Sequence, residues 1–224
     1  MIRKQSPSSI WKTKYINKSL VGVSNRPILC HVLEQFPEDT EFAIALGYKG
    51  DLVRDFLELA YPNRSFFYSN VDPYQGEGSG LGLSLLSLEE YLQQPFIFIS
   101  CDTLVIEDIP PPNSNWMGYS DAVDIEQYRT LQLARDNTVS KILDKGEIVP
   151  NQKAYIGLSG IYDYEKFWLN MKEGGSESVR LGEVYALNEL NGSVIWNDNL
   201  SLYIQKQSLD NISDIRGNPV INDN

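Results

Sequence analysis

Short apolar runs alternate with helix-forming segments through the first hundred residues, and this alternation restricts the chain to few folds. Residues 41–47, EFAIALG, predict a buried strand, and residues 65–71, SFFYSNV, predict a second one. Residues 51–61, between them, carry apolar side chains at helical spacing behind Asp51, a candidate N-cap. Residues 95–100, PFIFIS, form a continuous apolar run typical of a strand covered on both faces. Strands that alternate with helices predict βαβ units.

The second half of the chain differs in character. Residues 128–145 predict two strands around a turn, residues 154–164 a further strand, and residues 193–198 a short one, with helical patterns between the last two. A length of 224 residues suits one well-buried domain and is short for two. We therefore expect an α/β fold, a single-domain three-layer sandwich with a mostly parallel mixed sheet, over residues 1–207. Residues 208–224 are expected to form a polar tail.

Composition excludes several classes of partner. The net charge of −11 disfavours nucleic acid and anionic membranes. No apolar run approaches the roughly 20 residues of a membrane span, and the N-terminus has no apolar signal segment. Cys30 and Cys101 are too few for a disulfide framework, so we expect a reducing, cytoplasmic setting. Residues 1–33 hold six basic side chains and no acid, which indicates either an anion-binding region or a solvated basic arm.

Two features around the third predicted strand could carry chemistry. Asp102 follows this strand, and ligands of open parallel sheets bind beyond the carboxyl ends of the strands. Asp102 is therefore either a Mg²⁺ ligand or a turn or N-cap residue. Upstream, glycine occupies every second position at Gly76, Gly78, Gly80 and Gly82, ahead of a helical segment. Such a loop either lets a ligand approach the backbone or makes a tight strand-to-helix turn.

Six segments carry a further pattern through their order and spacing. They are NKSLVGVSNRPILCHVLEQFP (17–37), FAIALGYKGDLVRDFLE (42–58), GEGSGLGLSLL (76–86), FIFISCDTLV (96–105), ILDKG (142–146) and IWNDNLSLY (195–203). Together they resemble the nucleotidyltransferases that couple a nucleoside triphosphate to a sugar phosphate or to phosphocholine. The resemblance covers about residues 5–206 and implies a nucleotide-diphospho-sugar transferase-like fold.

The resemblance implies roles for individual residues. Lys18 would contact the triphosphate, and Lys145 would contact the acceptor phosphate. Asp102 and Asp198 would hold Mg²⁺ against the phosphates, so Asp102 would also contribute to nucleotide binding. Because the reaction brings two anions together, it requires positioning and charge neutralisation, and the ionised acceptor phosphate needs no general base. The residues that would line the nucleobase and sugar are Gly76, Gly78 and Gly80.

The chain departs from this family at two points. The family's first loop, AAGxGSR, corresponds to residues 6–10 here, where both glycines and the arginine are absent and Pro7 removes an N–H donor. The hydroxyl and amide groups of Ser8 and Ser9 are expected to bind the triphosphate in its place. The last motif keeps Asp198 but lacks the Thr-Gly of the family's DTGN.

The sequence thus predicts a Mg²⁺-dependent nucleotidyltransferase that joins a nucleoside triphosphate to a sugar phosphate or phospho-alcohol and releases pyrophosphate. The segment NKSLVGV slightly favours CTP, and the product would serve surface polysaccharide or lipid synthesis. Two alternatives stay open: a nucleotide-binding or regulatory protein of the same fold that has lost turnover, and a glycosyltransferase of the related fold. Neither the acceptor nor the oligomeric state follows from the sequence.

The sequence also gives expectations for several other side chains. His31 is expected to be structural, and Cys101 a small buried filler rather than a nucleophile. Five aromatic residues could form a cage for a quaternary ammonium group or could belong to the core. They are Trp116, Tyr119, Tyr155, Tyr162 and Trp168.

Overall fold

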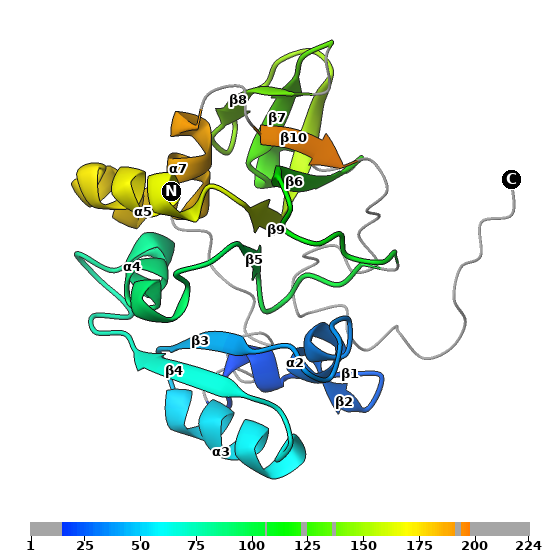
Figure 1. The fold of residues 1–224 in the computed structure, drawn as a ribbon, viewed down its shortest axis with the longest axis vertical. Coiled ribbons are helices and arrows are strands. Elements are labelled where there is room, and N and C mark those ends of the chain that lie inside the picture. Colours follow the sequence, from blue (N-terminus) through cyan, green and yellow to red (C-terminus); the bar gives the residue numbers. More distant parts are fainter. Residues whose placement is uncertain (1–14, 106, 122–124, 136–137, 191–193, 198–224) are drawn as a thin grey trace, which may run out of the picture.

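The computed structural model describes residues 15–105, 107–121, 125–135, 138–190 and 194–197 (Figure 1). Its first part holds a small parallel sheet of two strands, with one helix before the first strand and another helix between the two strands. The elements of this part are η1 (Lys18–Leu20), β1 (Gly22–Val23), β2 (Arg26–Pro27), α2 (Ile28–Leu33), β3 (Phe42–Leu46), α3 (Gly50–Ala60) and β4 (Phe66–Asn70).

The second part is built around a larger sheet and a group of helices on one side of it (Figure 1). Its helical elements are α4 (Leu81–Leu86), η2 (Glu89–Tyr91), η3 (Ile125–Gln127), α5 (Tyr164–Glu173), α6 (Gly175–Leu181) and α7 (Glu183–Glu189). Its strands are β5 (Phe96–Ile99), β6 (Asn115–Ser120), β7 (Thr130–Leu133), β8 (Val139–Leu143), β9 (Gln152–Ile161) and β10 (Val194–Asn197).

Strands β3 and β4 form the predicted βαβ unit. They pair in parallel, from Phe42 opposite Phe66 to Leu46 opposite Asn70, and α3 connects them. Helix α3 buries Val53 and Leu57 in a core cluster that also contains Leu46. Burial of such side chains supplies roughly 25 cal/mol per Å² of apolar surface, which stabilises the unit.

The start of helix α3 differs from the sequence prediction. Asp51 is not its N-cap: the capping position is Lys49, in the left-handed conformation and without a side-chain bond. Asp51 lies in the first turn instead, where its negative charge complements the helix dipole.

The long strand β9 organises the larger sheet. One of its edges pairs with β6, and the other pairs with β7 along its first half and with β5 along its second half. All of these pairs are antiparallel, while β10 joins β6 in parallel. The predicted α/β class and mixed sheet are confirmed. Parallel pairing within the described residues is confined to β3–β4 and β6–β10, because β9 runs back between β5 and β6.

The main core lies between this sheet and α5 and α7. The Phe96 ring stacks on Trp168, with centroids 5.6 Å apart, and meets Phe167 edge to face at the same centroid distance. The Trp168 indole N–H donates to the carbonyl of Leu92, 2.9 Å away, so its polar atom is satisfied. Strand β5 is thereby anchored firmly, which positions the residues that follow it. Within the described residues, no helix has the length and apolar character required to cross a membrane.

Candidate active site

Asp102 lies in a tight turn immediately beyond β5. The turn is held by the Ser100 amide, which donates to the Gly157 carbonyl at 2.8 Å. It is also held by the buried Thr103 hydroxyl, which donates to the Ile156 carbonyl at 2.7 Å. No helix begins at Asp102, so the N-cap interpretation is wrong. The turn interpretation and the ligand interpretation are compatible, because the turn presents the carboxylate at the end of a strand.

Lys18 reaches Asp102 from the other part of the molecule. Its ammonium group forms an ion pair with the Asp102 carboxylate across 84 positions of sequence. The Asp102 side chain is 11% exposed and that of Lys18 is 47% exposed, so the pair is partly shielded from water. Burial disfavours the charged ammonium, yet the Asp102 carboxylate outweighs it, and the pKa of Lys18 lies above its ordinary value.

Asn17 fixes the position from which Lys18 extends. Its side-chain oxygen accepts a hydrogen bond from the Ser19 amide at 2.9 Å and caps η1. Its amide nitrogen donates to the carbonyl of Tyr48 at 2.6 Å, in the loop after β3. The segment that carries Lys18 is therefore tied to the carboxyl end of β3, the side where ligands of such sheets bind.

Glycine is favoured at the four alternating positions for different local reasons. Gly76 and Gly78 adopt positive φ angles of 86° and 80°, and a Cβ atom at Gly76 would meet nothing within 4 Å. At Gly80 and Gly82, by contrast, a Cβ atom would lie 2.2 Å from the carbonyl oxygen of Val179 and 2.0 Å from that of Ser178. Packing of α4 against α6 thus requires the last two glycines, while Gly76 and Gly78 form an open, exposed loop.

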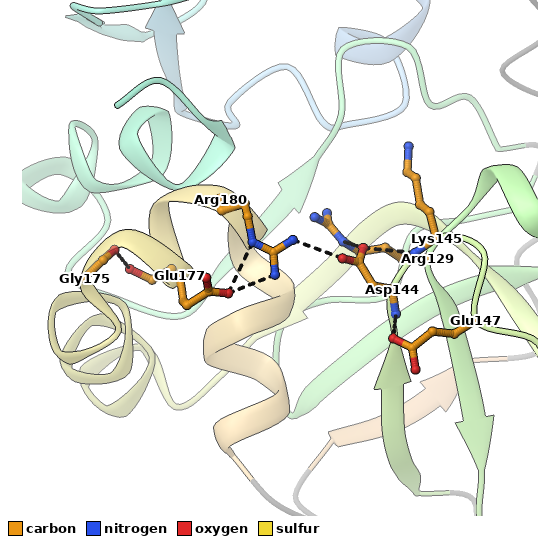
Figure 2. Close-up of polar contacts among 8 residues, drawn as sticks. Arg129, Asp144, Lys145, Glu147, Gly175, Glu177 and Arg180 are labelled. Carbon is orange, nitrogen blue, oxygen red and sulfur yellow. Dashed lines mark hydrogen bonds and ion pairs between the residues drawn. The ribbon is translucent and has the colours of Figure 1, made fainter. Parts of the chain in front are cut away.

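Lys145 follows an aspartate that organises a group of charges (Figure 2). The Asp144 carboxylate accepts from the Lys145 amide at 3.0 Å and pairs with Arg180 at 3.0 Å and Arg129 at 3.4 Å. Arg180 also contacts Glu177 at 2.8 Å. Burial raises the pKa of Asp144, but the Lys145 amide and the two arginines outweigh it, and the pKa lies below its ordinary value.

Figure 2 shows the Lys145 side chain extending away from the charges around Asp144. The sequence did not point to Arg129 or Arg180, because neither lies in one of the six segments that resemble nucleotidyltransferases.

Several predicted site residues lie outside the described residues. These are Ser8, Ser9 and Asp198, so their roles remain predictions. In the part of the chain that the structure describes, no group of three or more His, Cys, Asp or Glu side chains could hold a metal ion. Asp102 is the described member of the predicted metal pair, and a single carboxylate fits Mg²⁺, which takes one or two carboxylates with substrate phosphates and water.

Two minor predictions near the site have different outcomes. His31 is structural, as expected, because its Nε2 atom lies 3.0 Å from the Val23 carbonyl oxygen and ties α2 to β1. Cys101 is exposed, so the prediction of a buried filler is wrong. The reason is that the chain leaves the sheet after Ser100 and turns, which brings Cys101 to the surface beside Asp102.

The five aromatic residues do not gather into one cage. Trp116 packs with Val105 and Leu158 in one core cluster, whereas Trp168 belongs to a separate cluster around β5 and α5. Both indoles are almost fully buried, and the core interpretation is therefore the correct one for them.

Comparison with known proteins gives the class of fold. No protein-family model matches the chain. The bifunctional protein GlmU of Methanocaldococcus jannaschii is 23% identical over 156 residues, which cover 66% of this chain and 35% of that protein. The chain thus matches about a third of the length of this curated relative.

Solved structures resemble the chain more completely. A protein from Bacillus anthracis assigned as a glucose-1-phosphate thymidylyltransferase has a TM-score of 0.69 at 19% identity, covering 85% of this chain and 81% of that one. The inositol-1-phosphate CTP transferase from T. maritima has a TM-score of 0.61 at 14% identity, covering 86% and 79%. HddC from Yersinia pseudotuberculosis has a TM-score of 0.57 at 18% identity, covering 81% and 80%.

The chain has the nucleotide-diphospho-sugar transferase fold of these structures. The similarities also agree with the resemblance to nucleotidyltransferases that the sequence motifs carry.

Proposed function

We propose that this protein is a nucleotidyltransferase that joins a nucleoside triphosphate to a sugar phosphate or a phospho-alcohol and releases pyrophosphate. The observation that carries the proposal is the pairing of Lys18 with Asp102 at the carboxyl end of β5. A cation and the carboxylate proposed to bind the metal, from distant parts of the chain, lie together where this fold class binds ligands. The thymidylyltransferase and CTP transferase among the structures of the same fold support this class of reaction.

Mg²⁺ is the proposed cofactor, with Asp102 and Asp198 as its ligands. When bound, Mg²⁺ would neutralise charge on the phosphate oxygens. Asp102 suits this role because its carboxylate is presented by a rigid turn beyond an anchored strand. Lys18 would bind the triphosphate beside it, together with Ser8 and Ser9, and Gly76, Gly78 and Gly80 would line the nucleobase and sugar.

The acceptor phosphate would bind near Lys145. Arg180 and Arg129 both form ion pairs with Asp144, the residue before Lys145. Three cationic side chains therefore come from positions near the end of β8. Asp144 holds the two guanidinium groups in place, which limits the entropy that their side chains lose when a phosphate binds beside them. Arg180 is the better candidate for direct phosphate contact, because its side chain is the more exposed of the two.

The reaction itself is a single displacement at the α-phosphorus. An oxygen of the acceptor phosphate forms a bond to the α-phosphorus, the bond from that phosphorus to the bridging oxygen of the β-phosphate breaks, and pyrophosphate leaves with the electron pair. Lys18 and Lys145 offset the negative charge of the two phosphates as they approach each other. CTP is the preferred triphosphate, and surface polysaccharide or lipid precursor synthesis is the preferred setting; both rest on the sequence resemblance.

The test is an assay of pyrophosphate release. The protein is incubated with Mg²⁺, each of the common nucleoside triphosphates in turn, and a panel that contains hexose 1-phosphates, inositol 1-phosphate and phosphocholine. Release that requires one triphosphate and one acceptor together supports the proposal. Release without any acceptor would indicate a hydrolase and contradict it.

A second candidate is a binding or regulatory protein of the same fold that has lost turnover. The specific observation in its favour is the sequence of residues 6–10, which lacks the glycines and arginine of the family's first loop. Calorimetric titration with the same triphosphates separates the two candidates. Tight nucleotide binding without pyrophosphate release for any acceptor favours the second.

A further inference from the structure

The Lys18–Asp102 ion pair has a consequence for metal binding. Asp102 is the described carboxylate of the proposed metal site, and the Lys18 ammonium group already contacts one of its oxygens, Oδ2. A metal ion on the same carboxylate would bring a divalent charge close to this ammonium group, and like charges at contact distance repel strongly in a partly shielded site. Metal binding at Asp102 therefore favours an arrangement in which the Lys18 ammonium group moves away.

Lys18 is able to move, whereas Asp102 is not. The Lys18 side chain is long and 47% exposed, so it can reorient toward the open side of the site. Asp102 is 11% exposed and lies in a turn fixed by the Ser100 amide and the Thr103 hydroxyl. The backbone of Lys18 is also fixed, by the Asn17 cap and its bond to Tyr48. Only the Lys18 side chain therefore needs to move when a metal ion binds to Asp102.

A displaced Lys18 needs a new anionic partner. The pair is partly shielded from water by the mostly buried Asp102 side chain, and an ammonium group that loses its counter-ion in such a place is less stable. A polyphosphate bound beside Asp102 would supply phosphate oxygens that pair with Lys18 in place of the Asp102 carboxylate. Metal alone would leave Lys18 without compensation, whereas metal and polyphosphate together would satisfy both charges.

We propose that Lys18 is an exchangeable counter-ion of Asp102, which occupies the carboxylate until a divalent cation and a polyphosphate arrive together. This inference rests on the proposed function and adds the order of events at its site. It makes metal and polyphosphate binding mutually dependent, since each raises the affinity of the protein for the other by the same factor. The site would accordingly hold little free metal in the absence of nucleotide.

The experiment measures Mn²⁺ binding to the full chain by electron paramagnetic resonance, without nucleotide. Lys18→Met removes the competing charge and should bind Mn²⁺ roughly tenfold more tightly than the wild type, a typical coupling between two sites. Lys18→Arg keeps the charge and should bind like the wild type. The double variant Lys18→Met with Asp102→Asn should lose the gain. Equal affinity of Lys18→Met and wild type, or a gain that persists in the double variant, would overturn the proposal.

A second measurement on the wild type guards against misfolding of the variants. Nitrogen NMR of the lysine side chains should show the Lys18 ammonium resonance changing as Mg²⁺ and inorganic tripolyphosphate are added together, and changing little with Mg²⁺ alone. An equal change with Mg²⁺ alone would contradict the mutual dependence. None of these readouts needs turnover, so absence of pyrophosphate release would defeat the proposed function and leave this inference standing on its own result.

Discussion

At the residue scale, the sequence identified Lys18 and Asp102 as site residues but did not indicate that they contact each other. Asp102 was conspicuous because it ends an apolar strand, and Lys18 because of the motif around it. Nothing in the spacing of 84 residues indicates that they touch, because that depends on how η1 is tied to the loop after β3. Arg129 and Arg180 were missed for a similar reason, since only the folded chain brings β7, β8 and α6 to Asp144.

The charges around Asp144 give a prediction for the acceptor. Arg180→Met should raise the KM for the phosphorylated acceptor by roughly tenfold or more, because hydrogen bonds to charged groups contribute about 1.5–3 kcal/mol. The KM for the triphosphate should change little. Steady-state kinetics of pyrophosphate release provide the measurement. Arg135→Met, an exposed arginine on the β7–β8 turn, is the matched control and should behave like the wild type. Equal effects of the two variants on the acceptor KM would contradict the assignment of Arg180.

Asp144 also predicts how stability depends on pH. Its pKa is lower in the folded protein than its ordinary value, so its stabilising contribution is present above that value and is lost as the pH falls through the folded pKa. The difference in unfolding free energy between the wild type and Asp144→Asn should therefore shrink below about pH 4. Because the side chain is 40% exposed, the whole effect should stay under about 1 kcal/mol. Urea unfolding at neutral and acidic pH measures it, and a difference that grows on acidification would refute the assignment.

At the element scale, most strands and helices followed from apolar periodicity, and the exceptions have physical reasons. Helix α6 was not predicted because its sequence begins with glycine and serine, which are weak helix formers. It is stabilised by the Ser178 hydroxyl, which donates to the carbonyls of Met171 and Gly175. The helix expected after the glycine loop is divided into α4 and η2.

The contact between α4 and α6 predicts the effect of adding one methyl group. Gly82→Ala would place Cβ 2.0 Å from the Ser178 carbonyl oxygen and 2.7 Å from the Val179 Cα atom, and backbone cannot move aside cheaply. We expect a loss of about 1–3 kcal/mol in the free energy of unfolding, as for other overpacked sites. Gly22→Ala is the control: its Cβ would meet only the Arg26 carbonyl oxygen, at 3.9 Å, so the change should stay within about 0.5 kcal/mol. Thermal unfolding compares them, and similar melting temperatures would show that α4 does not pack as described.

At the scale of the whole molecule, the fold class was predictable and the strand order was not. Alternating strands and helices indicate an α/β fold, but the pairing of β5 with β9 joins residues about 60 positions apart, and local patterns carry no information on such distances. The family motifs supplied the missing long-range information, because their order implies a known arrangement. The solved structures of the same fold agree with it.

We propose that the pair Lys18–Asp102 belongs to a site that transfers a nucleotidyl group to a phosphate. Phosphorus NMR of a reaction with the best triphosphate and acceptor measures this transfer. The wild type should give two products in equal amounts, pyrophosphate and a pyrophosphate diester that links nucleoside to acceptor, and Asp102→Asn should give neither. Formation of orthophosphate in their place, or the same products at the same rate with Asp102→Asn, would contradict the proposal.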